Sequence, residues 1–337
     1  MTNYTGIQGQ NILIVSSDPS NPTEGQIWYN STSNLLKGYA NVVTNAWAAG
    51  GNLGTARYQL GGTGTQTAGL AFGGRDANSV DTGATEEYNG SSWTAGGSLN
   101  TARRLVKGFG IQTAAVAAGG FNNPSGAYHN VEEYNGTSWT ANAAPGELGT
   151  GRYSAGCAGI QTAGLIFGGS DVSPGFLSIT EEYDGSAGTA GGNMNTGRAG
   201  LGGTGTQTAG LAFGGAIAPP ASPPSRTAVT EEYDGTSWTS GGTMNTIRSG
   251  LSGAGTQTAA LGFGGTPGSG YTGATELYNG TSWTSNPNSM ATTRQTSGGA
   301  GTQTSALVFG GEIATGASAA TEEWTGTDLA VRTITTS

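Results

Sequence analysis

The sequence predicts an all-β protein whose sheets repeat around a common axis. Glycine makes up 64 of the 337 residues, well above the usual share of about 7%. Because glycine costs about 1 kcal/mol relative to alanine inside a helix, this content argues against a helical fold. A pattern of about 47 residues returns six times after residue 50, and each copy contains four short strand-like segments. Four-stranded units of this length are typical of the blades of a β-propeller.

The repeat carries the same residue types at the same places in each copy. It opens with an arginine on the first segment, passes through a turn that contains glutamine, and reaches a Gly-Gly pair after a hydrophobic second segment. An acidic pair followed by an aromatic residue marks the third segment, and a tryptophan marks the fourth. The leading arginines are Arg57, Arg103, Arg152, Arg198, Arg248 and Arg294.

The third and fourth segments are joined by Asn-Gly or Asp-Gly in five copies, which begin at Asn89, Asn135, Asp184, Asp234 and Asn279. This dipeptide suits the positive φ angles of a two-residue β-hairpin. We therefore expect a two-residue hairpin in each of these blades.

This combination of marks resembles the kelch repeat. Hydrophobic residues running into Gly-Gly, a following tyrosine, a tryptophan soon afterwards and a basic residue opening the next strand look like the kelch pattern across residues 53–329. The resemblance implies a single β-propeller of four-stranded blades. The third copy departs from it with Gly188 near the place of its tryptophan, and the last copy has Leu329 there.

A second resemblance lies near the N-terminus. Residues 17–39, which begin SDPSNPTEGQIWYN, are similar to an N-terminal segment of bacteriophage tail-fibre and other virion proteins. Glycine-rich kelch-like arrays behind such a segment resemble proteins of marine phages. The resemblance implies a virion protein that is made in the host cytoplasm, and the N-terminus does not have the pattern of a secretory signal.

The number of blades is open between seven and six. We expect an N-terminal extension at 1–24 and the propeller at 25–337, with a partial or first blade at 25–51 and six repeats from about 52. Seven blades are favoured, because the chain is about seven repeats long and Trp47 begins a phrase that resembles the fourth segment of the first repeat. In a six-bladed ring, Trp47 would instead supply the outer strand that the last repeat lacks.

The repeat arginines are interpreted as structural residues. Alternate side chains of a strand point to opposite faces, so one glutamate of each acidic pair can reach an arginine on a neighbouring strand or blade. We expect inter-blade ion pairs at all six arginines, and the alternative is a charged ring for a ligand. The tyrosines and tryptophans are expected to pack between blades, and Cys157 is expected to be a small buried filler rather than a reactive thiol.

Composition argues against several classes of function. With one cysteine and one histidine, the chain offers no cysteine-based or multi-histidine metal site, and a catalytic triad could use only His129. The net charge of -9 disfavours nucleic-acid binding, because phosphate contacts need a basic surface. No apolar run approaches the ~18 residues of a membrane span. We therefore expect no enzyme, cofactor, metal, nucleic-acid partner or membrane insertion.

Sequence variation is concentrated in the loops between the second and third segments. These loops share almost no sequence, and variable loops on a constant scaffold commonly form binding surfaces; the alternative is neutral drift. The loops span 75–85, 121–131, 170–180, 216–230, 266–275 and 312–321. The candidate ligand-binding residues are Asp76, Asn78, Phe121, Tyr128, His129, Phe176, Arg226 and Tyr271.

The expected function is recognition without catalysis. The chain is interpreted as a phage virion protein, a tail-fibre or appendage module that recognises a glycan or protein of the host surface. Its partners would be other virion proteins or copies of itself, and host surface polysaccharide or protein. The alternative is a purely structural virion subunit, a head-decoration or tail-shell protein with only subunit–subunit contacts.

Overall fold

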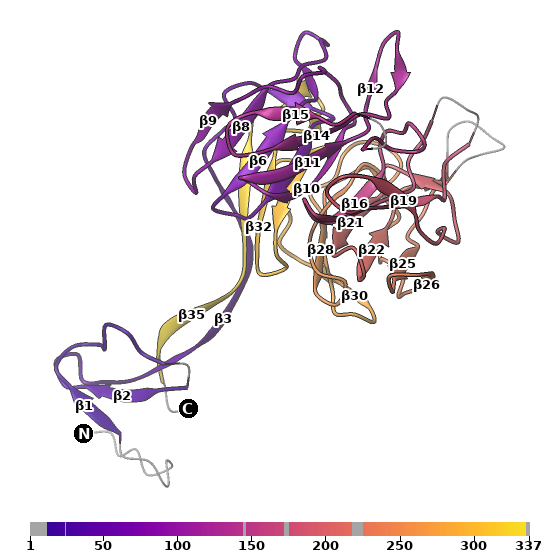
Figure 1. Ribbon diagram of the computed structural model, residues 1–337. Coiled ribbons are helices and arrows are strands. Elements are labelled where there is room, and N and C mark those ends of the chain that lie inside the picture. The colour runs from indigo at the N-terminus through magenta and orange to yellow at the C-terminus, as the bar shows by residue number, and fades with distance from the viewer. Residues whose placement is uncertain (1–11, 24, 144–145, 172–174, 218–224, 335–337) are drawn as a thin grey trace. The chain divides into compact units, whose positions relative to one another are not determined.

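The computed structural model describes residues 12–23, 25–143, 146–171, 175–217 and 225–334. These residues form strands and turns and no helix, so the all-β prediction is confirmed for the described part of the chain (Figure 1). The chain divides into two compact units: Ala46–Trp324, and a smaller unit that combines Met1–Asn45 with Thr325–Ser337. The expected propeller boundary at residue 25 lies inside the smaller unit.

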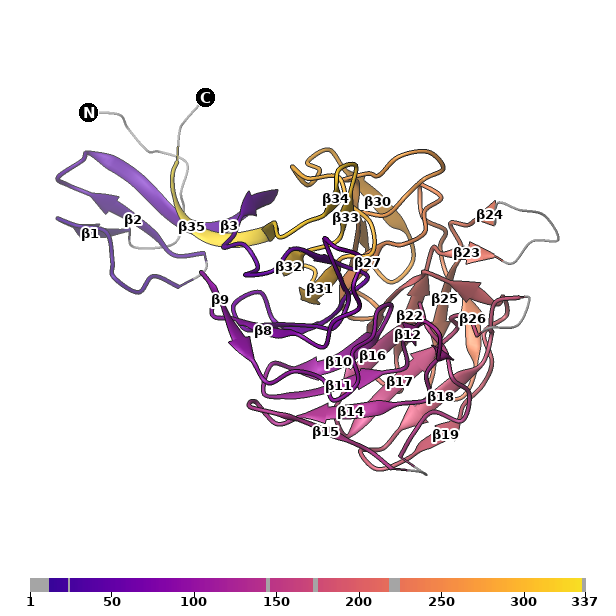
Figure 2. The same ribbon diagram turned by 90° about the horizontal axis from the view of Figure 1, so that it is seen from above.

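The larger unit contains five antiparallel sheets of four strands, each formed by one repeat. Figure 2 shows them side by side around a common centre. The first two sheets comprise β5 (Gly61–Gly64), β6 (Gly69–Phe72), β8 (Thr85–Tyr88) and β9 (Trp93–Gly96), then β10 (Lys107–Ile111), β11 (Ala114–Ala118), β14 (Val131–Tyr134) and β15 (Trp139–Ala141). The third comprises β16 (Gly156–Ile160), β17 (Ala163–Phe167), β18 (Thr180–Tyr183) and β19 (Gly188–Ala190). The fourth and fifth comprise β21 (Gly202–Gly205), β22 (Gly210–Phe213), β25 (Thr230–Tyr233) and β26 (Trp238–Ser240), then β27 (Ser252–Gly255), β28 (Ala260–Phe263), β29 (Thr275–Tyr278) and β30 (Trp283–Asn286).

A sixth four-stranded arrangement joins the two ends of the repeat array. Its strands are β31 (Gly298–Gly301), β32 (Ser305–Phe309), the start of β35 (Thr321–Thr333) and the end of β3 (Leu35–Ala49). Trp47 of β3 stands where the repeat tryptophan is missing, and its indole N–H donates to Thr275 Oγ1 at 2.9 Å. Residues 25–51 therefore do not form the additional four-stranded sheet that the sequence favoured; their last strand completes the sheet of the last repeat.

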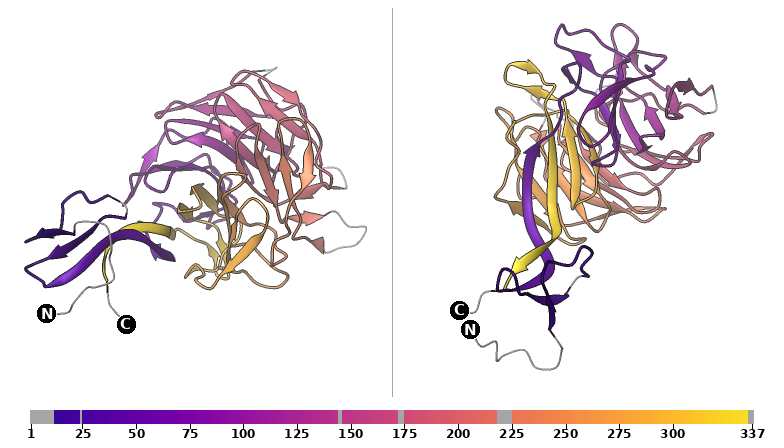
Figure 3. Two further views of the ribbon diagram at one scale, coloured as in Figure 1. Left: turned by 90° about the horizontal axis from the view of Figure 1, so that it is seen from below. Right: turned by 90° about the vertical axis from the view of Figure 1, so that its left-hand side faces the viewer.

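Six residues with positive φ form a closed cycle of main-chain hydrogen bonds. Each N–H donates to the carbonyl of the equivalent residue in the preceding repeat, over 2.7–3.1 Å, and the first repeat donates to the last. Their φ angles lie between 50° and 66°. The members are Gln59, Leu105, Ser154, Gly200, Gly250 and Thr296. The cycle follows the repeat arginines and immediately precedes the inner strands, whose arrangement is also visible in Figure 3.

Glycines on the inner strands make room for phenylalanine rings. A Cβ atom at Gly61 would lie 2.3 Å from the Phe72 ring of the same sheet, and one at Gly108 of the next sheet would lie 2.2 Å from the same ring. Both distances are far below van der Waals contact. The high glycine content thus reflects close packing between phenylalanines of the second strand and inner strands of two adjacent sheets.

The Asn-Gly turns differ from the two-residue hairpin that the sequence predicts. Tyr88 pairs with Trp93, which leaves a four-residue turn, 89–92. Only Gly90 has positive φ in this turn, at 91°. The side-chain oxygen of Asn89 instead accepts main-chain N–H bonds from Ser91 and Ser92, so the asparagine acts by capping the turn rather than by adopting positive φ.

Short strand pairs stand on the loop side of the sheets, where the loops between second and third strands begin. They are β4 (Arg57–Tyr58) with β7 (Arg75–Asp76), β12 (Phe121–Asn122) with β13 (Gly126–Ala127), β20 (Arg198–Ala199) with β23 (Ala216–Ile217) and β24 (Ser225–Arg226), and β33 (Glu312–Ile313) with β34 (Gly316–Ala317). We call this side of the larger unit the loop face.

The smaller unit is organised around Asp18. Strand β1 (Leu13–Val15) pairs in parallel with β2 (Ile27–Asn30), which pairs antiparallel with the start of β3. Asp18 accepts hydrogen bonds from Trp28 and Asn30 and lies 2.7 Å from Lys37 Nζ. These contacts, Lys37 above all, lower the pKa of Asp18 to about 2. The motif at 17–39 thus encodes a local polar cluster over the buried Trp28 ring.

Candidate functional site

The six repeat arginines are buried and bind glutamates of their own repeats. Arg198 Nη2 lies 2.9 Å from Glu231 Oε1, while Nη1 donates to the carbonyls of Gly214 and Val229. The pairs are Arg57–Glu86, Arg103–Glu132, Arg152–Glu181, Arg198–Glu231, Arg248–Glu276 and Arg294–Glu322. The expected inter-blade ion pairs are therefore intra-repeat pairs, because each guanidinium reaches the third strand of its own sheet beside the Gly-Gly pair.

The main chain of the same arginines provides the contact between adjacent sheets. The second glycine of each Gly-Gly pair donates its N–H to the arginine carbonyl of the following repeat, as Gly169 does to Arg198 at 2.8 Å. The bond recurs at all six arginines and includes Gly311 to Arg57, from the last repeat to the first. Each arginine thus holds the preceding sheet with its backbone and its own sheet with its side chain.

The repeat tyrosines and tryptophans bond to the preceding sheet. Tyr134 donates to Glu87 at 2.6 Å, and Trp139 donates to Thr85 at 2.9 Å. Equivalent tyrosine bonds are Tyr88–Glu323, Tyr183–Glu133, Tyr233–Glu182 and Tyr278–Glu232, and equivalent tryptophan bonds are Trp93–Thr321, Trp238–Thr180, Trp283–Thr230 and Trp47–Thr275. Burial, reinforced by Glu323, raises the pKa of Tyr88 to about 12, so this phenol remains a donor at physiological pH.

The glutamine of each inner turn bridges two sheets. Gln207 Nε2 donates to the carbonyls of Gly164 and Tyr183 in the preceding sheet, at 3.1 and 2.9 Å. The six glutamines, Gln66, Gln112, Gln161, Gln207, Gln257 and Gln303, make the same pair of bonds over 2.6–3.3 Å. This contact gives a physical reason for the near-constant turn sequence.

One tryptophan–threonine bond and one tyrosine–glutamate bond between adjacent sheets are absent, and in each case both partners are replaced. Gly188 stands at the tryptophan position of the third repeat, and Val131 stands at the threonine that would accept its bond. Trp324 stands at the tyrosine position of the last repeat, and Leu277 at the glutamate that would face it. Leu277 packs against the hydrophobic cluster that contains Trp324. Because both partners of each bond are replaced, neither substitution leaves a partner side chain without its donor or acceptor.

A ring of short pairings surrounds the cycle of main-chain hydrogen bonds on the loop face. The residue after each repeat arginine pairs with the residue after each Gly-Gly pair, and we call these twelve residues the collar. They are Tyr58–Arg75, Arg104–Phe121, Tyr153–Ser170, Ala199–Ala216, Ser249–Thr266 and Gln295–Glu312. The first two pairs each join an aromatic and a basic side chain, and the third adds Tyr153. The fourth and fifth pairs carry small side chains, so the collar lacks the sixfold regularity of the scaffold.

The aromatic and basic sector of the collar is held together across three repeats. Arg104 lies 2.6 Å from Asp81, which also lies 3.4 Å from Arg75. The Arg104 guanidinium stands over the Phe121 ring at 4.7 Å, and Phe121 makes an edge contact with Tyr153 at 5.1 Å between ring centroids. These contacts fix a contiguous cluster of rings and charges, in which Arg104 and Asp81 are largely buried and Arg75 is 30% exposed.

The candidate residues predicted from the sequence occupy loops of five different repeats, so they are spread around the loop face. Asp76 caps its own turn, because its carboxylate accepts N–H bonds from Asn78 and Val80. Asn78 is exposed, and Phe121 belongs to the collar. Phe176 pairs with Ser170 by a β-bridge.

The other predicted residues are also engaged with neighbouring chain segments. His129 uses both ring nitrogens: Nδ1 lies 2.7 Å from the Leu148 carbonyl, and Nε2 accepts from the Gly151 N–H. Arg226 lies in β24, and Tyr128 donates its main-chain N–H to a Gly-Gly carbonyl. Burial and the neighbouring Glu312 raise the pKa of Tyr271. Part of the proline-rich loop, 218–224, lies outside the described residues.

Sequence reasoning missed most of the collar. Tyr58, Arg104 and Tyr153 directly follow repeat arginines, and the residues around them also differ between copies. The available signal was therefore the residue that follows each constant arginine, which differs between copies outside the variable loops.

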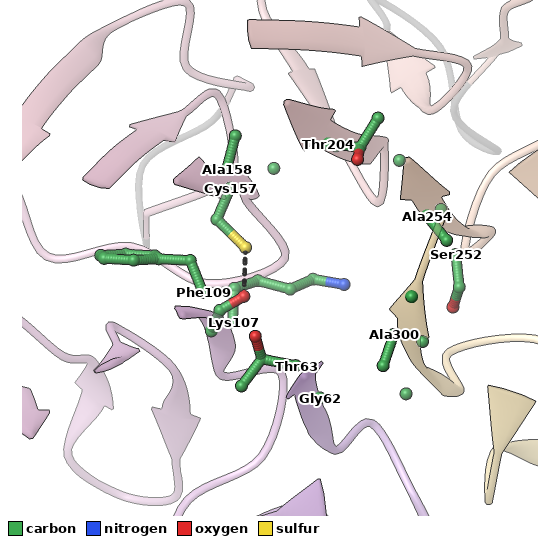
Figure 4. Close-up of a pocket in the computed structure, with 18 of the residues that line it drawn as sticks. Gly62, Thr63, Lys107, Phe109, Cys157, Ala158, Thr204, Ser252, Ala254 and Ala300 are labelled. Carbon is green, nitrogen blue, oxygen red and sulfur yellow. Dashed lines mark hydrogen bonds between the residues drawn. The ribbon is translucent and has the colours of Figure 1, made fainter. Parts of the chain in front are cut away.

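The six inner strands enclose a central cavity of about 170 Å³. Its lining consists mainly of glycine with small, hydroxyl and apolar side chains, and Figure 4 shows Lys107 and Cys157 among them. Cys157 is half-buried and its thiol donates to the Gly108 carbonyl. Burial raises the pKa of this thiol to about 11, so the sulfur is protonated and unreactive at neutral pH.

Among the described residues there is no cluster of three or more histidine, cysteine or acidic side chains suited to a metal ion. Within the same part of the chain, no helix has the length and hydropathy of a membrane span.

Comparisons with known proteins relate the chain to others through its fold alone. No protein-family model and no curated protein matches the sequence. Among solved structures, the chain is similar to one described as "Structure of YjhT", with a TM-score of 0.65 and 14% sequence identity. The match covers 83% of this chain and 99% of that chain. At this identity the likeness concerns architecture, and together with the repeated four-stranded sheets it shows a β-propeller-like fold.

Proposed function

We propose that the larger unit is a closed six-bladed propeller of the kelch type. The support is that the main-chain cycle, the six glutamine bridges and the six Gly-Gly to arginine bonds each run from the last repeat back to the first. Trp47 supports the same count, because it makes the tryptophan–threonine bond that the last repeat cannot make with Leu329. A closed ring leaves no sheet face of the first or last blade uncovered, and only short, protected sheet edges remain.

We further propose that the chain is a non-enzymatic phage virion protein, a tail-fibre or appendage module that binds a glycan or protein of the host surface. The observation that carries the proposal is the irregular collar on an otherwise regular scaffold. Interior contacts repeat almost unchanged from blade to blade, while the collar changes from rings and charges to small residues. Variation confined to one rigid surface is typical of recognition.

The aromatic and basic sector has the chemistry to bind a sugar. Aromatic rings offer flat apolar faces to the C–H groups of a pyranose, and guanidinium, carboxylate and amide groups can bond its hydroxyls. Tyr58, Phe121 and Tyr153 supply rings, while the partly exposed Arg75 supplies a polar group. Because Arg104 and Asp81 are already paired, little side-chain entropy would be lost on binding.

The test is binding of the purified chain to host cells and to their isolated polysaccharide. Tyr58→Ala combined with Tyr153→Ala should weaken binding at least about tenfold, since hot spots are enriched in tyrosine and arginine. Thr140→Ala, on an exposed outer-strand position, is the matched control and should bind normally. Unchanged binding by a double variant that keeps its fold would reject the loop face as the recognition surface.

One observation favours a purely structural virion subunit as the second candidate. The turns at the opposite end of the sheets repeat the same capped Asn-Gly or Asp-Gly geometry in five repeats. A surface that offers the same groups around a ring suits docking onto a symmetric neighbour. Binding to virion proteins without binding to host cells would favour this candidate.

A further inference from the structure

Lys107 places its amino group in the central cavity. It lies on β10, the inner strand of the second sheet, and Figure 4 shows its side chain extending into the cavity toward the wall that carries Ser252 and Ala254. The equivalent inner-strand positions of the other repeats hold Gly61, Gly156, Gly202, Ser252 and Gly298. A lysine here is therefore a departure from the repeat and not part of its scaffold.

The lysine fits because its neighbours have changed with it. Lys107 pairs with Ala118, whereas the glycines at its position face phenylalanines, as Gly61 faces Phe72. A Cβ at Gly61 would clash with that ring at 2.3 Å. The small Ala118 removes the clash in the second sheet.

Cys157 also replaces a repeat glycine, and Ala118 makes room for it as well. In other repeats the equivalent residue is glycine and packs under the phenylalanine of the preceding sheet; a Cβ at Gly203 would lie 2.9 Å from the Phe167 ring. With Ala118 in place of that phenylalanine, there is room for both Lys107 and Cys157. Lys107, Ala118 and Cys157 therefore form one coordinated replacement.

The ammonium has no carboxylate partner in the described structure. Its Nζ takes part in none of the ion pairs there, and no acidic side chain lines the cavity. The nearby Cys157 thiol is protonated, so it supplies no negative charge. Burial lowers the pKa of Lys107, which reflects the free-energy cost of an unpaired charge away from bulk water.

The cavity is large enough to hold a small anion from solution, and its walls offer hydrogen-bond donors to that anion. A space of about 170 Å³ exceeds the volume of several waters. The six inner strands are edge strands of their sheets, and an edge strand leaves alternate main-chain N–H groups unused. At the turn end the lining residues are Gly64, Gly110, Gly159, Gly205, Gly255 and Gly301, which carry no side chain to narrow the opening.

We propose that the central cavity binds one small anion, a carboxylate or phosphate of a few heavy atoms, with Lys107 as its charged ligand. The ammonium neutralises the anion, and inner-strand N–H groups complete its hydrogen bonds. The glycan proposal concerns the collar, and the anion site stands independently of it.

The test is thermal unfolding of the full chain with sodium phosphate or sodium acetate, at ionic strength held constant with a bulky buffer anion. Wild-type protein should show a saturable rise in melting temperature with at least one of the two anions. The phosphate and acetate arms distinguish an inorganic oxyanion from a carboxylate as the better ligand.

Two variants control the charge and the packing separately. Lys107→Met removes the charge alone, and Lys107→Gly with Ala118→Phe and Cys157→Gly restores the repeat pattern. Both should fold and bind the anion at least about tenfold more weakly than wild type. A saturable shift of equal affinity in a folded variant would overturn the proposal, as would no shift with either anion in the wild type.

Discussion

Replacing Arg198 with alanine tests whether the buried intra-repeat ion pairs hold the ring together. The Arg198 side chain is fully buried, and its partner Glu231 is 1% exposed. Alanine would leave the Glu231 carboxylate with hydrogen bonds from Asn195 alone. It would also remove the side-chain donor to the carbonyls of Gly214 and Val229, of which Val229 keeps the Gly214 N–H. We expect a large loss of stability from this one substitution.

The expected magnitude follows from the uncompensated buried charge. Removing one partner of a buried pair costs about 3–5 kcal/mol. A chain of 337 residues has an unfolding entropy of roughly 0.7 kcal/mol/K near 60 °C, so the melting temperature should fall by about 4–7 °C. Burial lowers the pKa of Arg198, and Glu231 partly offsets that effect.

Differential scanning calorimetry of two matched variants makes the comparison. Arg75→Ala removes an arginine that is 30% exposed and whose partner Asp81 keeps Arg104, so it should cost less than about 1 kcal/mol. Arg198→Ala with Glu231→Gln removes the buried charge and should recover part of the loss. Equal melting temperatures for Arg198→Ala and Arg75→Ala would refute the structural role.

Three further predictions address other contacts. Gln207→Ala removes two bonds to the preceding sheet and should cost about 1–3 kcal/mol in chemical denaturation; a neutral result would contradict the bridging role. Thr230→Val leaves the Trp283 indole N–H without its acceptor and should also cost about 1–3 kcal/mol. Valine is native at the equivalent Val131, where Gly188 replaces the tryptophan. An unchanged calorimetric melting temperature of Thr230→Val would therefore contradict the idea that the threonine and the tryptophan must be replaced together. Because the pKa of Asp18 is lowered from 3.8 to about 2, its contribution to the smaller unit should be complete above about pH 4 and lost as the pH falls toward 2. Hydrogen exchange at the Trp28 indole N–H should report this loss, and Asp18→Asn should abolish its pH dependence.

The repeat made most of the larger unit predictable, because each strand is marked by a local pattern. Alternating burial along segments such as Gly61–Gly64 and the glycines at the turns follow from short-range chemistry. The arginine pairs were harder to assign. Period-two geometry indicates which face Glu231 occupies, but the choice between its own sheet and the next depends on the path of the chain around the Gly-Gly pair.

Features that depend on ring closure were only partly visible in the sequence. The phrase at Trp47 matches the fourth segment of a repeat, so it fitted both an additional blade and the outer strand of the last repeat; its pairing partner lies some 275 residues away in β35. The collar arises only when the residues after six separate arginines meet around one axis. The link between Lys107 and Ala118 likewise requires the strand register, which fixes which glycine faces which phenylalanine.

The central claim is a six-bladed ring closed by residues 46–49, and direct imaging of the purified chain down its axis tests it most directly. A cryo-electron microscopy or crystal structure should show six four-stranded blades, with Trp47 on the outermost strand of the last blade and its indole N–H bonded to Thr275, as in the present structure. A seventh blade built from residues 25–51, or a last blade completed without Trp47, would contradict the account.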